Sequence, residues 1–181
     1  KVSANAGQSK DLEIKEPRIY FGEEESQYVV VNTSMKEFDY PQGEKNATTT
    51  YKAQSGIKVG SFFKRAAWAL RFQSLQMMLS SYITPDSQIL INRNVKDRIT
   101  ELAPWLTVDD DLYTAIINGR LVWIADGYTT SSMYPYAERL ENSDTNYIRN
   151  SVKITVDAYT GKTTFYAFDE KDPILKAWRT I

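Results

Sequence analysis

Apolar side chains recur at helical spacing in two stretches of the chain. Residues 61–82, SFFKRAAWALRFQSLQMMLSSY, carry apolar groups three and four positions apart, and Ser61 is a favourable helix N-cap. This pattern predicts one long helix at the centre of the core. A second, shorter helix is predicted over residues 93–103, where Pro104 stops it because proline disfavours the helical conformation of the preceding residue.

Strand patterns occupy most of the remaining chain. Two hairpins are predicted, and the first has Asn118–Gly119 as its two-residue turn, a strong hairpin signal. The stretch 40–60 shows no periodicity and is expected to be a surface loop, and a short terminal helix is expected after Asp172. The predicted strands are 18–21, 28–33 and 88–92, with the hairpins 112–117/120–128 and 147–156/163–168.

Helices and antiparallel strands therefore come in separate runs, which is typical of the α+β class. We expect an antiparallel sheet packed against one long and one shorter helix. Residues 1–15 are polar and unpatterned and are expected to form a flexible arm, and residues 16–181 are expected to form a single domain. The residues expected to be buried together are Phe63, Leu70, Leu75, Leu79, Ile99, Leu102, Trp123, Ile154 and Val156.

If Leu70 lies in that core, its replacement by alanine should cost about 2–5 kcal/mol of stability.

Composition excludes several kinds of chemistry. The 181 residues contain no His and no Cys, so disulfides, thiolate nucleophiles, Cys/His zinc sites and a Ser-His-Asp triad are absent from this chain. The net charge is −1, which gives no overall signal for nucleic acid. No cofactor and no tightly held transition metal are expected. No apolar run approaches the roughly 20 residues that span a bilayer.

Carboxylates are the remaining candidates for catalysis or metal binding. Asp157 and Gly161 of the last hairpin fit turn chemistry, in which the carboxylate accepts backbone N–H groups and glycine takes a positive φ. The run Asp109, Asp110 and Asp111 is a weak calcium candidate, because calcium needs several convergent oxygen ligands. This run and a second acidic cluster, Glu23, Glu24 and Glu25, could also supply the carboxylate pair of a glycoside hydrolase, if a cleft held them at a fixed separation.

Four tyrosines surround a polar loop near residues 129–145. Tyrosine offers a large contact area and a hydroxyl group, so such a loop is a candidate binding surface. The alternative is that the rings pack the loop onto its own sheet. The candidate binding residues are Tyr128, Tyr134, Tyr136 and Tyr147.

Longer segments of the chain resemble a known family. The segments PRIYFGE, YVVVNTSMKEFDYP, FFKRAAWALRF and DGYTTSSMYPYAE, with NYIRNSVKITVDAYTGKTTFYAFDEKDPILKAW, are similar to the uncharacterised protein family 0182 of large bacterial multi-pass membrane proteins. The resemblance implies that this chain is one segment of a soluble region on the extracytoplasmic face of the cell membrane. Its implied partners are the rest of the parent protein and other envelope proteins. No nucleic acid partner is expected, because the charges of the chain are nearly balanced. The resemblance implies no activity, cofactor or catalytic residue.

Three functions remain open at this point. A non-enzymatic extracytoplasmic binding or interaction module is favoured. The segment VKITVDAYTGKTTFY also resembles the last hairpin of PepSY modules, which implies regulation of a protease or of the parent's membrane domain. The third is a carboxylate-based hydrolase of envelope polysaccharide.

Overall fold

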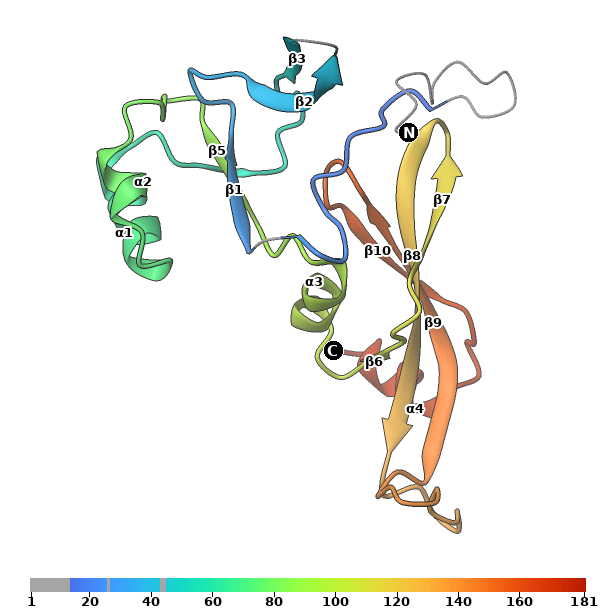
Figure 1. Ribbon diagram of the computed structural model, residues 1–181. Coiled ribbons are helices and arrows are strands. Elements are labelled where there is room, and N and C mark those ends of the chain that lie inside the picture. Colours follow the sequence, from blue (N-terminus) through green and yellow to red (C-terminus); the bar gives the residue numbers. More distant parts are fainter. Residues whose placement is uncertain (1–13, 26, 43–44) are drawn as a thin grey trace. The chain divides into compact units, whose positions relative to one another are not determined.

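The computed structural model describes residues 14–25, 27–42 and 45–181. The chain forms two compact units (Figure 1). Unit 1 consists of Lys1–Glu25 and Asn94–Ile181, and unit 2 consists of Ser26–Arg93. Most of the predicted N-terminal arm, residues 1–13, lies outside the described residues. The expectation of one domain over residues 16–181 stays a prediction, because two compact units can still unfold together.

Unit 1 is built on a five-stranded antiparallel sheet. The strands are ordered β10-β9-β8-β6, and β7 also pairs with β8. Both predicted hairpins are confirmed, and Asn118 (φ 54°) and Gly119 (φ 79°) supply the two positive φ angles of a type I′ turn. The strand bounds are β6 Thr107–Val108, β7 Tyr113–Ile117, β8 Arg120–Ser131, β9 Tyr147–Asp157 and β10 Thr163–Ala167.

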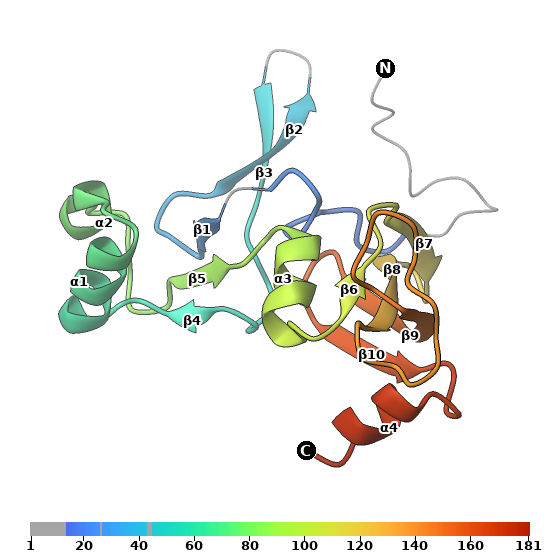
Figure 2. The same ribbon diagram turned by 90° about the horizontal axis from the view of Figure 1, so that it is seen from below.

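Two capped helices complete unit 1, and Figure 2 shows α3 next to β6 and α4 beside the sheet. In α3 (Val95–Leu102), the side chain of Asn94 accepts a hydrogen bond from Asp97 N at 3.0 Å. Asp172 caps α4 (Pro173–Trp178), as its side chain accepts from Ile174 N at 3.0 Å. Two residues that were expected in the core are not fully buried. Leu102 is 57% exposed at the end of α3, and Trp123 is only half-buried.

The core of unit 1 lies under β9. Val152, Ile154 and Val156 alternate along this strand and are buried, and Ile99 of α3 is buried as well. The period of two places all three β9 side chains on one face of the sheet. The predicted burial of Ile99, Ile154 and Val156 is confirmed.

The turn between β9 and β10 confirms the predicted chemistry. The Asp157 carboxylate accepts hydrogen bonds from Tyr159 N at 3.1 Å and Thr160 N at 2.7 Å, and Gly161 has a φ of 69°. The buried ring of Phe21 covers this glycine. The strand expected over residues 18–21 is therefore wrong: Tyr20 N and Phe21 N both donate to Ala158 O, so this segment follows the turn without forming a ladder.

Unit 2 contains a small three-stranded sheet and a separate hairpin. The sheet order is β1-β5-β4, with β1 Tyr28–Val31, β4 Ile57–Lys58 and β5 Gln88–Ile91. The expected surface loop over residues 40–60 is wrong, since β2 (Glu37–Gln42) pairs with β3 (Lys45–Thr49) in this region. No residue of this two-stranded ribbon that the structure describes is fully buried. Its sequence therefore lacks the alternation of apolar and polar residues that marks a half-buried strand.

The single long helix expected over residues 61–82 is also wrong, although its N-cap at Ser61 is confirmed. Two shorter helices stand there, α1 (Phe62–Arg71) and α2 (Leu75–Leu79). Gln73 adopts a φ of 51° after the last turn of α1, and Ser74 N donates to Ala69 O while Gln73 N donates to Leu70 O. This is a Schellman motif, which usually has glycine at the left-handed position.

The side of α1 and α2 that faces the sheet differs from the expected one. Ala69 and Met77 are buried against Val59 and Ile89, whereas Leu70 is 82% exposed. Trp68 and Phe72, with their rings stacked at 5.6 Å, pack on the same cluster. The expected burial was wrong for every large apolar residue assigned to these helices, namely Phe63, Leu70, Leu75 and Leu79.

Candidate functional site

The four candidate tyrosines have different surroundings. The rings of Tyr134 and Tyr147 stack with centroids 4.5 Å apart and an interplanar angle of 20°. The Tyr128 hydroxyl donates to Asp109 Oδ2 at 3.3 Å. Burial comes first among the causes that raise the pKa of Tyr128 and of Tyr147. Tyr136 alone of the four is fully exposed.

Asn146 organises the loop that carries Tyr136. Its side chain accepts from Tyr134 N at 2.9 Å and donates to Tyr134 O at 2.8 Å and to Ala137 O at 3.4 Å. Tyr136 lies within this closed segment with a φ of 58°, an uncommon conformation for a bulky residue. Met133, three residues earlier, is also largely exposed. The loop therefore holds one aromatic ring outward and packs a second ring onto its own sheet.

A buried carboxylate below this loop was not found from the sequence. Asp172 is fully buried and accepts hydrogen bonds from Thr129 Oγ1 and Ser151 Oγ, both at 2.5 Å, and from the Tyr147 hydroxyl at 2.8 Å. Burial alone would raise the pKa of Asp172, but the hydroxyl groups and the N–H of Ile174 outweigh burial and lower it. The network joins α4 to β8 and β9. The Asp172–Pro173 start of a helix was the only sequence signal for it.

The Asp109–Asp111 run has partners within the protein. Asp109 accepts from the Tyr128 hydroxyl, and Asp110 forms an ion pair with Lys96. Asp111 N donates to Asp109 Oδ1 at 3.4 Å, a contact within the turn itself. Across the described residues, no three Asp, Glu, His or Cys side chains form a group that could hold a metal ion. The calcium candidate stays a prediction without a converging ligand set.

The carboxylates with shifted pKa values do not resemble a general acid. Burial would raise the pKa of Asp157, but hydrogen bonds from Thr160 and the pairing with Arg120 at 2.7 Å lower it overall. The pKa of Asp172 is lowered as well. A glycoside hydrolase needs one carboxyl group whose pKa is raised, so that it holds a proton at neutral pH. Asp157 and Asp172 therefore fit structural roles.

A second surface that the sequence did not reveal lies in unit 2. Five large apolar side chains on α1 and α2 are between 65% and 84% exposed, and we call them the apolar helix face. Monomeric soluble proteins seldom expose several large apolar side chains together without a partner. The members of the apolar helix face are Phe62, Phe63, Leu70, Leu75 and Leu79.

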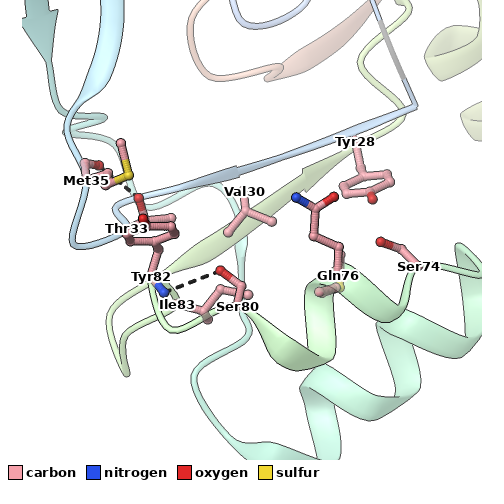
Figure 3. Close-up of a pocket in the computed structure, with 10 residues that line it drawn as sticks. Tyr28, Val30, Thr33, Met35, Ser74, Gln76, Ser80, Tyr82 and Ile83 are labelled. Carbon is pink, nitrogen blue, oxygen red and sulfur yellow. Dashed lines mark hydrogen bonds between the residues drawn. The ribbon is translucent and has the colours of Figure 1, made fainter.

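A hollow of about 260 Å³ lies between α2 and β1 (Figure 3). Its apolar lining includes Tyr28, Val30 and Ile83, and Gln76 and Ser80 add polar groups from α2. This volume is below the roughly 300–1,000 Å³ of typical small-molecule sites. The hollow suits a single side chain or a short apolar segment better than a cofactor.

A family model described as an uncharacterised protein family (UPF0182) matches residues 2–181. The chain belongs to UPF0182. A UPF0182 protein of Kineococcus radiotolerans is 44% identical over 98% of this chain and 20% of its own length. UPF0182 proteins of Frankia casuarinae (48% identity, 91% of this chain, 18% of the relative) and Bradyrhizobium diazoefficiens (47%, 93% and 18%) are similar.

Membership in UPF0182 confirms the resemblance seen in the sequence. The chain spans about one-fifth of the length of the UPF0182 relatives it matches. No solved structure matches the chain, so the PepSY-like hint in its last hairpin gains no support. None of the helices in the described ranges is long and apolar enough to cross a bilayer. The names of these relatives state no activity.

Proposed function

We propose that this UPF0182 segment is a non-enzymatic interaction module in the extracytoplasmic region of a larger bacterial membrane protein. The observation that carries the proposal is the exposure of the apolar helix face, where Leu70 and Phe63 are each more than 80% exposed. Leaving such side chains in water costs free energy, roughly 1.5–3 kcal/mol for each one that a partner would otherwise bury. A surface of this kind is typical of a binding site.

Two further facts support the proposal. The relatives extend over about five times the length matched here, so a UPF0182 protein contains further segments that could cover this face. The sequence also lacks the imidazole and thiol groups used in most nucleophilic and acid–base catalysis. The extracytoplasmic location is supported by the family resemblance of the quoted segments.

Cysteine labelling tests the proposal, because the chain contains no Cys. Leu70→Cys reports on the apolar helix face, and Glu141→Cys, at an exposed position of unit 1, is the control. Both variants are made in the 181-residue chain and in the full-length UPF0182 protein, whose native cysteines are replaced by serine. A membrane-impermeant maleimide then measures the labelling rate of each site, in solution and on intact cells.

We expect Leu70→Cys to react readily in the isolated chain and slowly in the full-length protein, since a partner covers it there. Glu141→Cys should react at similar rates in both, and its labelling on intact cells reports the extracytoplasmic side. Equal labelling of Leu70→Cys in both settings would exclude an interaction through this face. Labelling of Glu141→Cys only after cell lysis would exclude the extracytoplasmic location.

A further inference from the structure

The charges of the chain are divided unevenly between its two units. Unit 2 contains eight Lys and Arg residues against four Asp and Glu, a net charge of +4. Unit 1 contains 14 Lys and Arg against 19 Asp and Glu, a net charge of −5. Charge asymmetry between two parts of one chain is one sequence sign of interaction with nucleic acid or a membrane. The basic unit is also the one that carries the apolar helix face.

The cations of α1 lie beside its apolar side chains. Phe63, Ala67 and Leu70 are spaced i, i+4 and i+7, so they share one face of the helix. Lys64 and Arg71, both exposed, follow directly after Phe63 and Leu70 and so border that face. Residues 59–85, which include both helices, contain no acidic residue. Apolar and basic groups therefore alternate around the exposed side of α1.

The third cation of α1 has a structural role. The Arg65 guanidinium donates to Ser80 O at 3.4 Å and to Ile83 O at 3.2 Å, which ties α1 to the segment after α2. Arg65 is therefore turned toward the protein. Lys64 and Arg71 are exposed, and the Arg71 guanidinium lies 5.9 Å from the ring centres of both Trp68 and Phe72. Of the three cations of α1, Lys64 and Arg71 are therefore the ones whose exposure allows contact with an external anion.

We propose that the apolar helix face docks into the surface of an anionic lipid bilayer. The proposal rests on the interaction role proposed above and names its partner. A helix with Phe and Leu on one side and Lys and Arg next to them lies in the interface, with its apolar side chains among the acyl chains and its cations at the headgroup phosphates. Nucleic acid would use the cations but would leave the five apolar side chains in water.

A bilayer also fits this face better than a second copy of the chain. Two copies joined through it would bring Lys64 and Arg71 of each close to the same residues of the other, with no carboxylate from residues 59–85 to compensate. Lipid headgroups supply the missing negative charge. They also accept apolar side chains without the shape complementarity that a protein interface requires.

Vesicle co-sedimentation of the 181-residue chain tests the proposal. The probes are vesicles of phosphatidylcholine with phosphatidylglycerol, and vesicles of phosphatidylcholine alone. We expect binding to the anionic vesicles that is at least about tenfold stronger than to the neutral ones and that weakens as salt is raised. A Leu70→Ser/Leu75→Ser variant should lose about tenfold or more in binding, because two side chains no longer leave water.

Two controls isolate the role of the face. Met133→Ser/Ile181→Ser removes two apolar side chains from unit 1 that are 86% and 96% exposed, and this variant should bind as the unchanged chain does. Lys64→Gln/Arg71→Gln should bind both kinds of vesicle with the same low affinity. Circular dichroism and the melting temperature should be unchanged in every variant, since all six positions are exposed.

The outcomes separate this inference from the proposed function. Absence of binding to anionic vesicles, or equal binding by the unchanged chain and Leu70→Ser/Leu75→Ser, overturns lipid docking. If Leu70→Cys is nevertheless protected in the full-length protein, the interaction module stands and its partner is another protein segment. A dimer in light scattering that Leu70→Ser/Leu75→Ser dissociates would assign the face to self-association and would also overturn lipid docking.

Discussion

Gly161 lies at the point where the last hairpin of unit 1 meets the segment before unit 2. Its φ of 69° disfavours any side chain, and a Cβ atom built there would lie 2.5 Å from the ring of Phe21. Arg98 adds to this packing, because its Nε donates to Gly161 O at 2.7 Å and its guanidinium lies 4.9 Å from the centre of the Phe21 ring. The glycine therefore serves both the turn and the contact with Phe21.

We expect Gly161→Val to lower the free energy of unfolding by about 2–4 kcal/mol. The left-handed conformation accounts for about 1–2 kcal/mol of this loss, and the clash with Phe21 accounts for the rest. Chemical denaturation with urea measures the change. Lys162→Ala, at the next and exposed position, should stay within about 0.5 kcal/mol. A Gly161→Val protein as stable as the unchanged chain would show that Phe21 moves away from the turn at little cost.

The buried carboxylate of Asp172 should make the stability of the folded chain depend on pH. Its pKa is lowered in the folded chain, since three hydroxyl groups and the Ile174 N–H hydrogen-bond to the carboxylate despite its burial. The stabilisation is therefore complete above the unfolded pKa, about 3.9, and is lost as the pH falls through the lowered folded value. Asp172→Asn removes the charge and should cost about 1.5–3 kcal/mol at neutral pH.

The pH dependence shows whether Asp172→Asn destabilises the chain through loss of the charge or through loss of packing. Melting temperatures of the unchanged chain and Asp172→Asn should differ most at neutral pH and should converge as the pH falls below about 4. Asp144→Asn, in a surface ion pair with Arg139, should differ little from the unchanged chain at any pH. A gap for Asp172→Asn that stays constant down to low pH would mean that shape, and not charge, dominates at this site.

The helices of unit 2 show why the face expected to pack against the sheet was wrong. The stripe of apolar residues in 61–82 is broad, so two different faces fit the spacing. Small Ala69 faces the sheet together with Met77, and larger Leu70 faces away. Burial of large apolar side chains is the usual outcome, so a surface helix that leaves Phe63 and Leu70 outside indicates a partner.

This arrangement changes the effect on stability that is expected for Leu70→Ala. Leu70→Ala should now change the free energy of unfolding by no more than about 0.5 kcal/mol, because the side chain is 82% exposed. Met77→Ala, whose side chain is buried against Val59 and Ile89, should cost about 2–5 kcal/mol. Urea denaturation of both variants measures the difference. A large loss for Leu70→Ala would mean that α1 packs through the opposite face.

The elements that could be predicted from the sequence are those with strong local signals. Asn118–Gly119, Asp157–Gly161 and the Asp172–Pro173 helix start each encode their conformation in a few adjacent residues, and each is present. The break after α1 could not be predicted in this way, because Gln73 occupies the position where glycine normally signals a Schellman motif. The β2–β3 ribbon was missed since it buries no face.

Of the candidate surfaces, too, some features could be predicted from the sequence and others could not. Tyrosines around a polar loop could be found from sequence, but only the fold shows that Tyr134 stacks on Tyr147 while Tyr136 stays in solvent. The apolar helix face could not be found, because its residues have the same spacing as a buried stripe. The Asp172 network joins Thr129, Ser151 and Tyr147 from distant parts of the chain, and sequence spacing carries no information about such contacts.

Unit 2 is an insertion within unit 1. Unit 1 is interrupted after Glu25 and resumes at Asn94. The two ends are held together within unit 1: Val95 N donates to Gly22 O at 3.0 Å, and the Asn94 side chain donates to Glu23 O. Gly22 and Asn94 also form a parallel bridge. Insertions of this kind are tolerated where the ends of the host segment lie close together.

This closure predicts that unit 1 folds without unit 2. Replacing residues 26–93 with a short Gly/Ser linker should leave a protein with a sheet-type circular dichroism spectrum and one cooperative thermal transition, because the β8–β9 core and its Ile154 and Val156 side chains remain within unit 1. Adding Ile154→Ala to the shortened chain should lower its melting temperature, which ties the transition to that core. A cooperative transition would replace the expected single domain over residues 16–181 with two domains. A shortened chain that unfolds without cooperativity would instead mean that the core of unit 1 depends on unit 2, and the single-domain prediction would stand.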